Sequence, residues 1–461
     1  MDALFGAISQ HQHNPLATLA AQLTHRCGSD IIKQSQGGVY IGYGAAHKQA
    51  WQRKHHSGMA TIAGNMITIA GFFTGIHSLN LSPKMVLRNY LEQGESYLDQ
   101  LTGAFVLAIS QRDKGILMRD GAGQRSLYYT LLASGLYFAT EPKALHQLPD
   151  FDCQLDNKSL EQYLCFSFVP GKYTMLKDLY TLPPGYRLHW QRQSESLIID
   201  TERFYFFENL EKQQQSEQHW KNDFSQTFAD CVTERLPQDQ PVGIFLSGGL
   251  DSSIVTAEVA RQHQHPIHTY SLHFGKAYRH ELEFAEMVAK RYNTVHHEVL
   301  FKPKKMLRRL REIIWQLDEP SGDPITASNY ELAAHAKQDV NWIFNGEGGD
   351  PCFGGPKNYS MLLQHWYGGI ERGPYFREHA YLQSFKRAYD EIDALFTPEF
   401  RQSFNLEEDL FHVVRPYFQC QQPQGFLDKL MAMKKHRGSN LYIYYFMLYP
   451  YFYDASFTNR I

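Results

Sequence analysis

The sequence predicts two consecutive domains, a strand-rich α+β domain and a doubly wound α/β domain built on a mainly parallel sheet. Up to about residue 200, short apolar runs alternate with turn residues, which is typical of strands joined in hairpins. From about residue 219, apolar strands alternate with helices, which is typical of a parallel sheet. With 461 residues, of which 43% are hydrophobic, the chain is long enough for two such cores.

The first domain, residues 1–207, is predicted from apolar runs of strand length and from two segments with helical spacing. Residues 181–190 are predicted to be a turn that leads into a further strand, and the polar stretch at 208–218 is predicted to be a linker. The predicted strands are 37–44, 59–73, 103–110, 115–120, 126–132 and 135–140, and the predicted helices are 83–94 and 156–168.

The second domain, residues 219–461, is predicted from the alternation of strands and helices, and it ends in a mostly helical, aromatic part. Its predicted helices are 219–236, 251–264, 281–292, 306–317 and 328–338, and its predicted strands are 241–247, 267–274, 296–301 and 341–346.

Composition excludes several classes of protein. The net charge of -3 gives no basic excess for nucleic acid or an anionic membrane. Six scattered cysteines without a CxxC pair favour reduced thiols and a cytoplasmic location. No signal peptide is predicted, and the apolar tract 441–453 is too short for a membrane span and contains Pro450. The 22 histidines show no metal-ligand spacing, so we interpret them as surface or core residues rather than a zinc site.

The string "VGIFLSGGLDSSIV" at 242–255 places two glycines between a strand and a helix. Gly248 and Gly249 expose main-chain N–H groups, and the following helix offers its positive end, which together favour a phosphate or pyrophosphate. Asp251 would repel that anion unless Mg²⁺ bridges the two. The alternative is a glycine turn capped at a helix start. The hydroxyl donors nearby are Ser247, Ser252 and Ser253.

A second glycine cluster, "NWIFNGEGGDPCFGGPKN" at 341–358, also follows an apolar strand. Because the strand ends of a parallel sheet share one edge, the two clusters are expected to face one crevice. Asp251 and Asp350 would then share the Mg²⁺, and Glu347 is a candidate general base. The alternative is a loop with solvated carboxylates.

These two strings, with "LDEPSGDPITASNYELAAHAK" at 317–337, resemble the synthetase domain of the asparagine synthetase superfamily, which has a pyrophosphatase-type ATP loop. The strings "LTHRCGSD", "FATEPKAL" and "TMLKDLYTLPPGYRL" in the first domain are similar to the family's Ntn-type glutaminase domain. The resemblance implies an Ntn-like αββα domain followed by an ATP-pyrophosphatase domain.

The resemblance also implies a ligase that adenylates a carboxylate with ATP and Mg²⁺, releases pyrophosphate and transfers the acyl group to an amine or ammonia. Asp251 and Asp350 would bind Mg²⁺, and Glu347 would help to deprotonate the attacking nitrogen. By motif position, the pyrophosphate would be held by Ser247, Gly248, Gly249, Asp251 and Ser252, and the adenine site would be lined by Leu246, Leu272 and Gly346.

The sequence departs from the family pattern at two places. Asp2 stands where the family has its nucleophilic cysteine, Cys27 is not terminal, and the glutamine-binding "NGE" string has no counterpart. We therefore expect an inactive glutaminase fold, as in β-lactam synthetases and lasso-peptide cyclases. The chain also stops at Ile461, before the family's "R-x-PF-x-D" stretch and lysine-bearing helix. Lys434, Lys435 and Arg437 are interpreted as a solvated helix end.

Three functions therefore remain open. The first is an amide ligase for a small-molecule or peptide carboxylate and an amine. The second is an asparagine synthase that uses ammonia or glutamine. The third is a nucleotide-binding subunit that does not turn over. For the end of the chain three alternatives are open: the chain is a fragment, a partner subunit or a homodimer completes the site, or the chemistry is lost.

Overall fold

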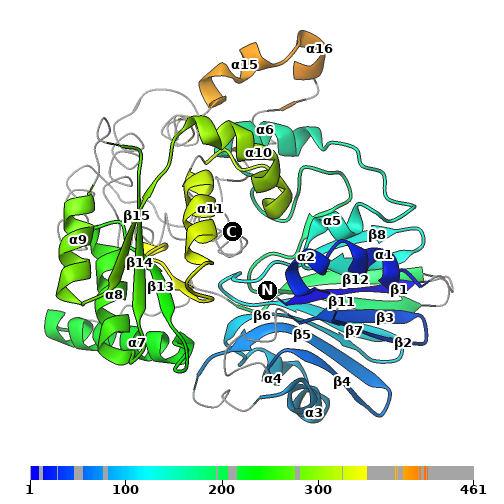
Figure 1. The fold of residues 1–461 in the computed structure, drawn as a ribbon. Helices are drawn as coiled ribbons and strands as arrows, with labels where there is room; N and C mark the ends of the chain where they lie inside the picture. The colour runs from blue at the N-terminus through cyan, green and yellow to red at the C-terminus, as the bar shows by residue number, and fades with distance from the viewer. Residues whose placement is uncertain are drawn as a thin grey trace. The chain divides into compact units, whose positions relative to one another are not determined.

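The computed structural model describes two compact units, which are treated separately below (Figure 1). The first unit comprises the described residues up to 205, residues 318–322 and those from 379 onward, and the second comprises 215–317 with 323 and 325–349. The described residues are 2–9, 14–28, 30–45, 56–75, 81–193, 196–205, 215–275, 281–323, 325–349, 379, 382, 388–402, 404–405, 410–411 and 413.

In the first unit, the described strands form two six-stranded antiparallel sheets. One sheet has the order β10 (Tyr180–Thr181), β8 (Tyr128–Leu132), β9 (Gly135–Ala139), β1 (Ala3–Ser9), β3 (Val39–Gly44) and β2 (Ile31–Gln36). The other has the order β12 (Ser196–Arg203), β11 (Tyr186–Gln193), β7 (Lys114–Arg119), β6 (Gly103–Ser110), β5 (Asn65–Phe73) and β4 (Gly58–Ile62).

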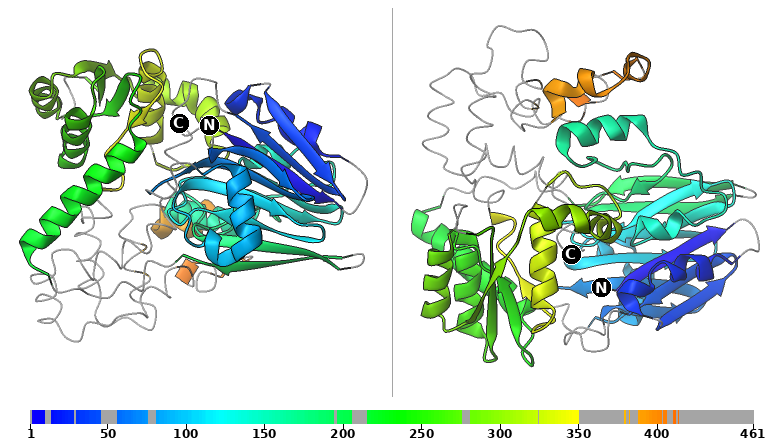
Figure 2. Two further views of the ribbon diagram at one scale, coloured as in Figure 1. Left: turned by 90° about the horizontal axis from the view of Figure 1, so that it is seen from below. Right: turned by 45° about the horizontal axis from the view of Figure 1, so that its top comes forward.

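The inner strands of both sheets, such as β1, β5 and β6, bury both of their faces, because each sheet lies between the other sheet and a layer of helices. In β1, Leu4 and Ile8 point to the core between the sheets, whereas Phe5 points to the helices. Helices α1 (Leu16–Ala21), α2 (Thr24–Cys27) and α5 (Pro142–Leu145) cover the first sheet, and α3 (Pro83–Gln93) and α4 (Glu95–Leu98) cover the second (Figures 1 and 2). The predicted αββα architecture is confirmed.

Local signals set the helix ends in this unit. The Ser82 hydroxyl accepts the Met85 N–H and Pro83 occupies the first turn, so α3 begins there. Gly94, with φ +74°, ends α3 in a conformation that favours glycine. In α6 (Asn157–Phe166), the Asp156 carboxylate accepts the Ser159 N–H at 2.8 Å.

In the second unit, the described strands form a four-stranded parallel sheet with the order β15, β14, β13 and β16. Helix α11 covers one face, while α7, α8 and α9 cover the other, so the predicted doubly wound sheet is confirmed (Figure 1). The bounds are β13 (Val242–Phe245), β14 (Ile267–His273), β15 (Val295–Leu300), β16 (Ile343–Phe344), α7 (Glu217–Arg235), α8 (Leu250–Gln262), α9 (Leu282–Arg291), α10 (Lys304–Leu317) and α11 (Ile325–Ala336).

Beyond residue 350 the structure describes short elements that cluster with the first unit. They are η3 (Ala388–Glu391), α15 (Ile392–Leu395) and α16 (Pro398–Arg401). The Arg401 guanidinium lies 3.6 Å from the buried Glu161 carboxylate of α6. The predicted aromatic segment 441–453 and the basic residues 434–437 lie outside the described residues. Within the described part, none of the helices has the length and apolar character needed to cross a bilayer.

Candidate functional site

The loop between β13 and α8 starts as a continuation of the sheet. The Leu246 N–H donates to the Tyr270 carbonyl at 2.9 Å, and the Ser271 hydroxyl donates to the Leu246 carbonyl at 2.5 Å. The chain then turns at Gly248, where φ is +92°. A Cβ at this position would lie 2.6 Å from the Glu281 carbonyl oxygen at the start of α9, so only glycine fits.

Serine hydroxyls hold this loop in shape. The Ser252 hydroxyl accepts the Ser247 N–H at 3.2 Å and lies 3.1 Å from the Ser247 hydroxyl. The Gly249 N–H donates to the Ser247 hydroxyl at 3.2 Å, and the Ser253 hydroxyl donates to the Gly249 carbonyl at 2.6 Å. Ser252 is 5% exposed and therefore braces the loop from inside, whereas Ser247 is exposed.

The second glycine cluster lies directly on the first turn of α8. Strand β16 pairs with β13 in parallel, with Ile343 opposite Gly243, so both strands end at the same edge. A Cβ at Gly346 would lie 2.6 Å from the Ser252 nitrogen, and a Cβ at Gly349 would overlap the Asp251 carboxyl group. The structure therefore brings the two predicted glycine segments into contact.

The acidic residues of the predicted site do not lie on one element. Asp251 stands in the first turn of α8, and Glu347 is exposed on the turn that follows β16. The Glu347 N–H donates to the Asn345 side-chain oxygen at 3.2 Å, which fixes that turn. Asp350, the second predicted Mg²⁺ ligand, lies outside the described residues.

This edge has the features of an anion site. The first turn of α8 presents main-chain N–H groups and the positive end of the helix dipole. Glycines at 248, 346 and 349 keep the backbone free of side chains where a Cβ would collide with neighbouring atoms. Asp251 adds a negative charge beside this site, so a phosphate would bind here together with a divalent cation that accepts carboxylate oxygens, such as Mg²⁺.

The two leucines predicted for the adenine site do not meet. The Leu246 side chain is 1% exposed and packs on Ala285 and Ala289 of α9. Leu272 is half-buried on the opposite face of the sheet, in the cluster with Tyr270 and α11. The Leu246 side chain is therefore enclosed, and its main-chain N–H and carbonyl are hydrogen-bonded to Tyr270 and Ser271.

In the first unit, Asp2 stands at the start of β1 with its carboxylate already bonded. The Ser57 hydroxyl lies 2.6 Å from the Asp2 carboxylate oxygen and 2.6 Å from the Gly71 carbonyl. Cys27 is 4% exposed, and its thiol donates to the Leu23 carbonyl at 3.2 Å. Burial raises the pKa of Cys27, so the thiol is protonated at neutral pH and is a poor nucleophile.

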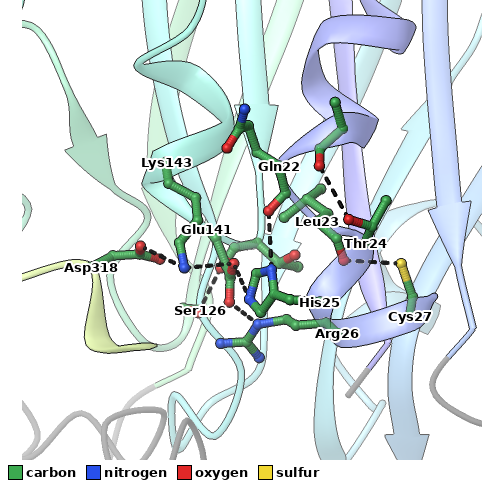
Figure 3. Close-up of polar contacts among 12 residues, drawn as sticks. Gln22, Leu23, Thr24, His25, Arg26, Cys27, Ser126, Glu141, Lys143 and Asp318 are labelled. Carbon is green, nitrogen blue, oxygen red and sulfur yellow. Dashed lines mark hydrogen bonds and ion pairs between the residues drawn. The ribbon is translucent and has the colours of Figure 1, made fainter. Parts of the chain in front are cut away.

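The first unit also contains a buried charged cluster that we did not predict, shown in Figure 3. The fully buried Glu141 carboxylate lies 3.1 Å from His25 Nε2 and 3.5 Å from Lys143 Nζ, and it forms an ion pair with the Arg26 guanidinium. Lys143 Nζ also lies 3.0 Å from the Asp318 carboxylate. Burial first, and then the positive charges of Lys143 and Arg26, lower the pKa of His25 to about 4.

The formal charges of this cluster balance within it. Glu141 and Asp318 are negative, Arg26 and Lys143 are positive, and His25 is neutral near pH 7. A balanced, buried set of charges joins α2, α5 and residue 318, and no external ion is needed to neutralise it. The strings "LTHR" and "FATEPKAL" contain residues of this cluster, but residues so far apart in the chain show no local pattern that predicts their contact.

Comparison with known families assigns most of the chain. Residues 223–433 match the family model described as asparagine synthase, and residues 83–205 match the model described as glutamine amidotransferase domain. The first match contains both glycine segments of the parallel sheet. The second covers most of the second sheet of the first unit with its helix α3.

Individual proteins give the same assignment. Asparagine synthetase [glutamine-hydrolyzing] 1 of Bacillus subtilis is 30% identical over 282 residues, which is 61% of this chain and 44% of that protein. Asparagine synthetase B of Escherichia coli is 29% identical over 291 residues, which is 59% of this chain and 46% of that protein. The chain thus spans about half the length of the curated relatives it matches.

One solved structure is a glutamine phosphoribosylpyrophosphate amidotransferase from B. subtilis complexed with ADP and GMP. It has a TM-score of 0.33 and 11% identity, and the match covers 65% of this chain and 90% of that one. At this TM-score the likeness carries no argument about the present chain.

Proposed function

Since the chain belongs to the asparagine synthetase superfamily, we propose that it is an ATP-dependent ligase that joins a carboxylate to an amine or ammonia. The observation that carries the proposal is the contact of the second glycine segment with the first turn of α8, the helix into which the first glycine segment leads. That contact would be expected of a site in which the main chain approaches phosphates closely.

The proposed reaction has two steps. An oxygen of the substrate carboxylate attacks the α-phosphorus of ATP, the bond from that phosphorus to the bridging oxygen breaks, and pyrophosphate leaves. The nitrogen of the amine or ammonia then attacks the acyl carbon, loses a proton, and AMP leaves with both electrons of its bond to that carbon. Positioning and electrostatic stabilisation of charge are the main contributions that the protein can make to the first step.

We assign the residues as follows. The loop from Ser247 to Gly249 and the first turn of α8 would hold the pyrophosphate, with Ser252 bracing the loop. Asp251 and Asp350 would hold Mg²⁺, which neutralises phosphate oxygens when bound. Glu347 is exposed at the same edge and would accept the proton of the attacking nitrogen. The main chain of Leu246, with Leu272 and Gly346, would border the adenine.

We also propose that the first unit does not hydrolyse glutamine. Asp2 lacks a nucleophilic sulfur, and its carboxylate is bonded to Ser57. The raised pKa of the buried Cys27 removes the nearest thiol as a substitute. The nitrogen would then come from an amine on the substrate or from free ammonia. Glu347 favours ammonia, because it stands where asparagine synthetases have their base by motif position.

The first experiment is calorimetric titration of the full chain with Mg-ATP. We expect binding that requires Mg²⁺ and is lost in Asp251→Asn. The matched control is Asp223→Asn. Asp223 is an exposed aspartate of α7 outside both glycine segments, so its change should not alter Mg-ATP binding. Folded protein that does not bind Mg-ATP would contradict both the ligase and the nucleotide-binding subunit. Binding without pyrophosphate release would favour the subunit that does not turn over.

A second experiment separates the two ligase candidates. Pyrophosphate release is measured with aspartate and ammonium, with aspartate and glutamine, and with carboxylates that carry their own amine. Release with aspartate and ammonium but not with glutamine would identify an ammonia-dependent asparagine synthase. Release that needs only a substrate with both a carboxylate and an amine would identify an amide ligase that uses the amine of its own substrate.

A further inference from the structure

Three side chains with metal-binding atoms meet on the face of the parallel sheet that α11 covers. His268 lies on β14, His297 lies on β15, and Asp339 follows the end of α11. His268 Nδ1 is 3.1 Å from His297 Nε2, and His297 Nε2 is 3.9 Å from an Asp339 carboxylate oxygen. The three ligand atoms all lie within 4.8 Å of one another.

These distances are close to those of a tetrahedral metal site. Nitrogen and oxygen ligands lie about 2.0–2.2 Å from Zn²⁺, so two ligands of one tetrahedral ion are about 3.4 Å apart. The two measured separations lie on either side of this value. The third separation is at most 4.8 Å, so an ion would need side-chain movements of about 1 Å, which rotation of the half-buried imidazole rings permits.

The carboxylate is held in place by a buried tyrosine. The Tyr270 hydroxyl donates to Asp339 Oδ2 at 2.9 Å, and the Tyr270 side chain is 1% exposed. The Tyr270 ring also stacks on the His297 ring, with centroids 4.7 Å apart. Support of this kind orients the ligands of metal sites, and its loss typically lowers metal affinity about 10–100-fold.

A second group, with one histidine and two carboxylates, serves as an internal comparison. Glu95, His189 and Glu202 of the first unit also gather their ligand atoms within 4.8 Å. There the Arg187 guanidinium lies 3.1 Å from Glu95 and 2.9 Å from Glu202, so a permanent cation already pairs with both carboxylates. Arg187 occupies the role that a metal ion would take.

The group around His268 differs from this second group in the charges that surround it. In the described part of the chain, the Asp339 carboxylate pairs with His297 at 3.9 Å and accepts from the Tyr270 hydroxyl, and neither of these partners is a permanent cation. Because a metal ion binds the neutral form of imidazole, two histidines and one carboxylate would present it with one negative charge. This ligand set suits Zn²⁺ and similar transition metals, whereas Mg²⁺ prefers oxygen ligands alone.

We propose that His268, His297 and Asp339 form a binding site for a zinc-type divalent ion, with Tyr270 as a positioning residue. The ion would join the edge strand β15 to β14 and to the segment that leads from α11 into β16. It would leave a fourth position for water. The site is separate from the ATP loop, and it does not rest on the proposed ligase function.

The histidine pairs in the sequence gave no indication of this site. Its ligands are 29 and 42 residues apart in the chain (268 to 297, and 297 to 339), far from the short spacings of local zinc motifs. The parallel register that places Tyr270 opposite His297 brings the two strands together, and the end of α11 supplies the carboxylate.

The test is titration of the full chain with Zn²⁺ after chelator treatment, without nucleotide. We expect one class of tight sites in the parent, weakened at least tenfold in His297→Ala and in Asp339→Asn and about tenfold in Tyr270→Phe. The control is His265→Ala, an exposed histidine outside the group, which should bind as the parent does. Circular dichroism confirms that each variant is folded, and the exposed, nearly isosteric Asp339→Asn keeps the test valid if His297→Ala is not.

Two outcomes would overturn the proposal. The parent might bind no Zn²⁺, or the folded Asp339→Asn variant might bind it as tightly as the parent. Either result would show that the three residues form only a chain of hydrogen bonds. Asp251→Asn should retain full Zn²⁺ binding, so failure of the ligase proposal and failure of this one are distinguishable.

Discussion

The edge of the parallel sheet and the cluster around Glu141 both gather polar side chains, but they differ in how those side chains meet water. At the sheet edge, Ser247 and Glu347 are exposed, and glycines keep the backbone bare. Around Glu141 the acidic and basic groups are buried and neutralise one another. A set of charges that is complete within the protein stabilises a fold, whereas exposed donors and acceptors are available to a ligand.

The same difference separates the two units of this chain. The first unit retains a complete core on both sides of its two sheets, while its Asp2 end is closed by internal hydrogen bonds. The second unit buries less of its helix surfaces but keeps its loop in a shape that only glycine can adopt. This comparison predicts that changes to the charged groups of the Glu141 cluster act on stability, and that changes to the charged groups at the sheet edge act on ligand binding.

The largest expected effect is on the Glu141 cluster. Glu141→Gln removes the buried carboxylate and leaves the charges of Arg26 and Lys143 without their shared partner. We expect the free energy of unfolding to fall by about 3–5 kcal/mol, measured by urea denaturation. The matched control is Glu92→Gln on the exposed side of α3, for which we expect a change of less than about 0.5 kcal/mol. Equal effects in both variants would contradict the role of the cluster.

Next in size is the loss of activity in Asp251→Asn. If the sheet edge binds Mg-ATP, removal of this charge should lower pyrophosphate release about 100-fold or more with little change in stability. Asp2→Asn is the counterpart in the first unit, and there we expect the rate of pyrophosphate release to stay within about twofold. A comparable loss in both variants would abolish the distinction between the two units.

A pair of glycines tests how tightly the loop is packed. Gly248 and Gly171 both have positive φ, +92° and +79°, but a Cβ at Gly171 meets nothing within 4 Å. Gly171→Ala should therefore cost only backbone strain, about 1 kcal/mol, whereas Gly248→Ala should cost about 2–3 kcal/mol because the Glu281 carbonyl lies in the way. Thermal unfolding measures both, and equal costs would show that the loop can shift.

Hydrophobic periodicity in the sequence was sufficient to predict a strand-rich unit and a parallel sheet, and to predict that the two glycine segments lie close together. Strands of a parallel sheet end at one edge, so strings that follow two such strands can be placed together without knowing the side chains. Motif position in the family resemblance placed Leu246 and Leu272 in one site, but adjacent strands offer both faces, and these two side chains point to opposite ones. Strand β1, central in its sheet, was not recognised in "ALFGAIS".

Long-range polar contacts were beyond the reach of the sequence. Glu141 meets His25 across 116 positions (141 − 25) and Lys143 meets Asp318 across 175 (318 − 143). No local spacing encodes such pairs, because they depend on how helices and connections pack after the sheets have formed. For Asp350 the sequence prediction stays a prediction.

The smallest expected effect is a dependence of stability on pH that comes from His25. Its pKa is about 4 in the folded protein and about 6.5 in the unfolded chain, so between these values the unfolded state binds more protons. Stability from this residue is therefore complete above about pH 6.5 and is lost as the pH falls toward 4. Because the ring is partly exposed, we expect about 1–2 kcal/mol, measured as the fall in the free energy of unfolding between pH 7 and pH 4.5.

His25→Gln should flatten this slope, whereas His265→Gln, at an exposed position of the second unit, should leave it unchanged. An unchanged slope in His25→Gln would mean that water reaches the ring. The Glu141 cluster would then be less shielded from water than its comparison with the sheet edge requires.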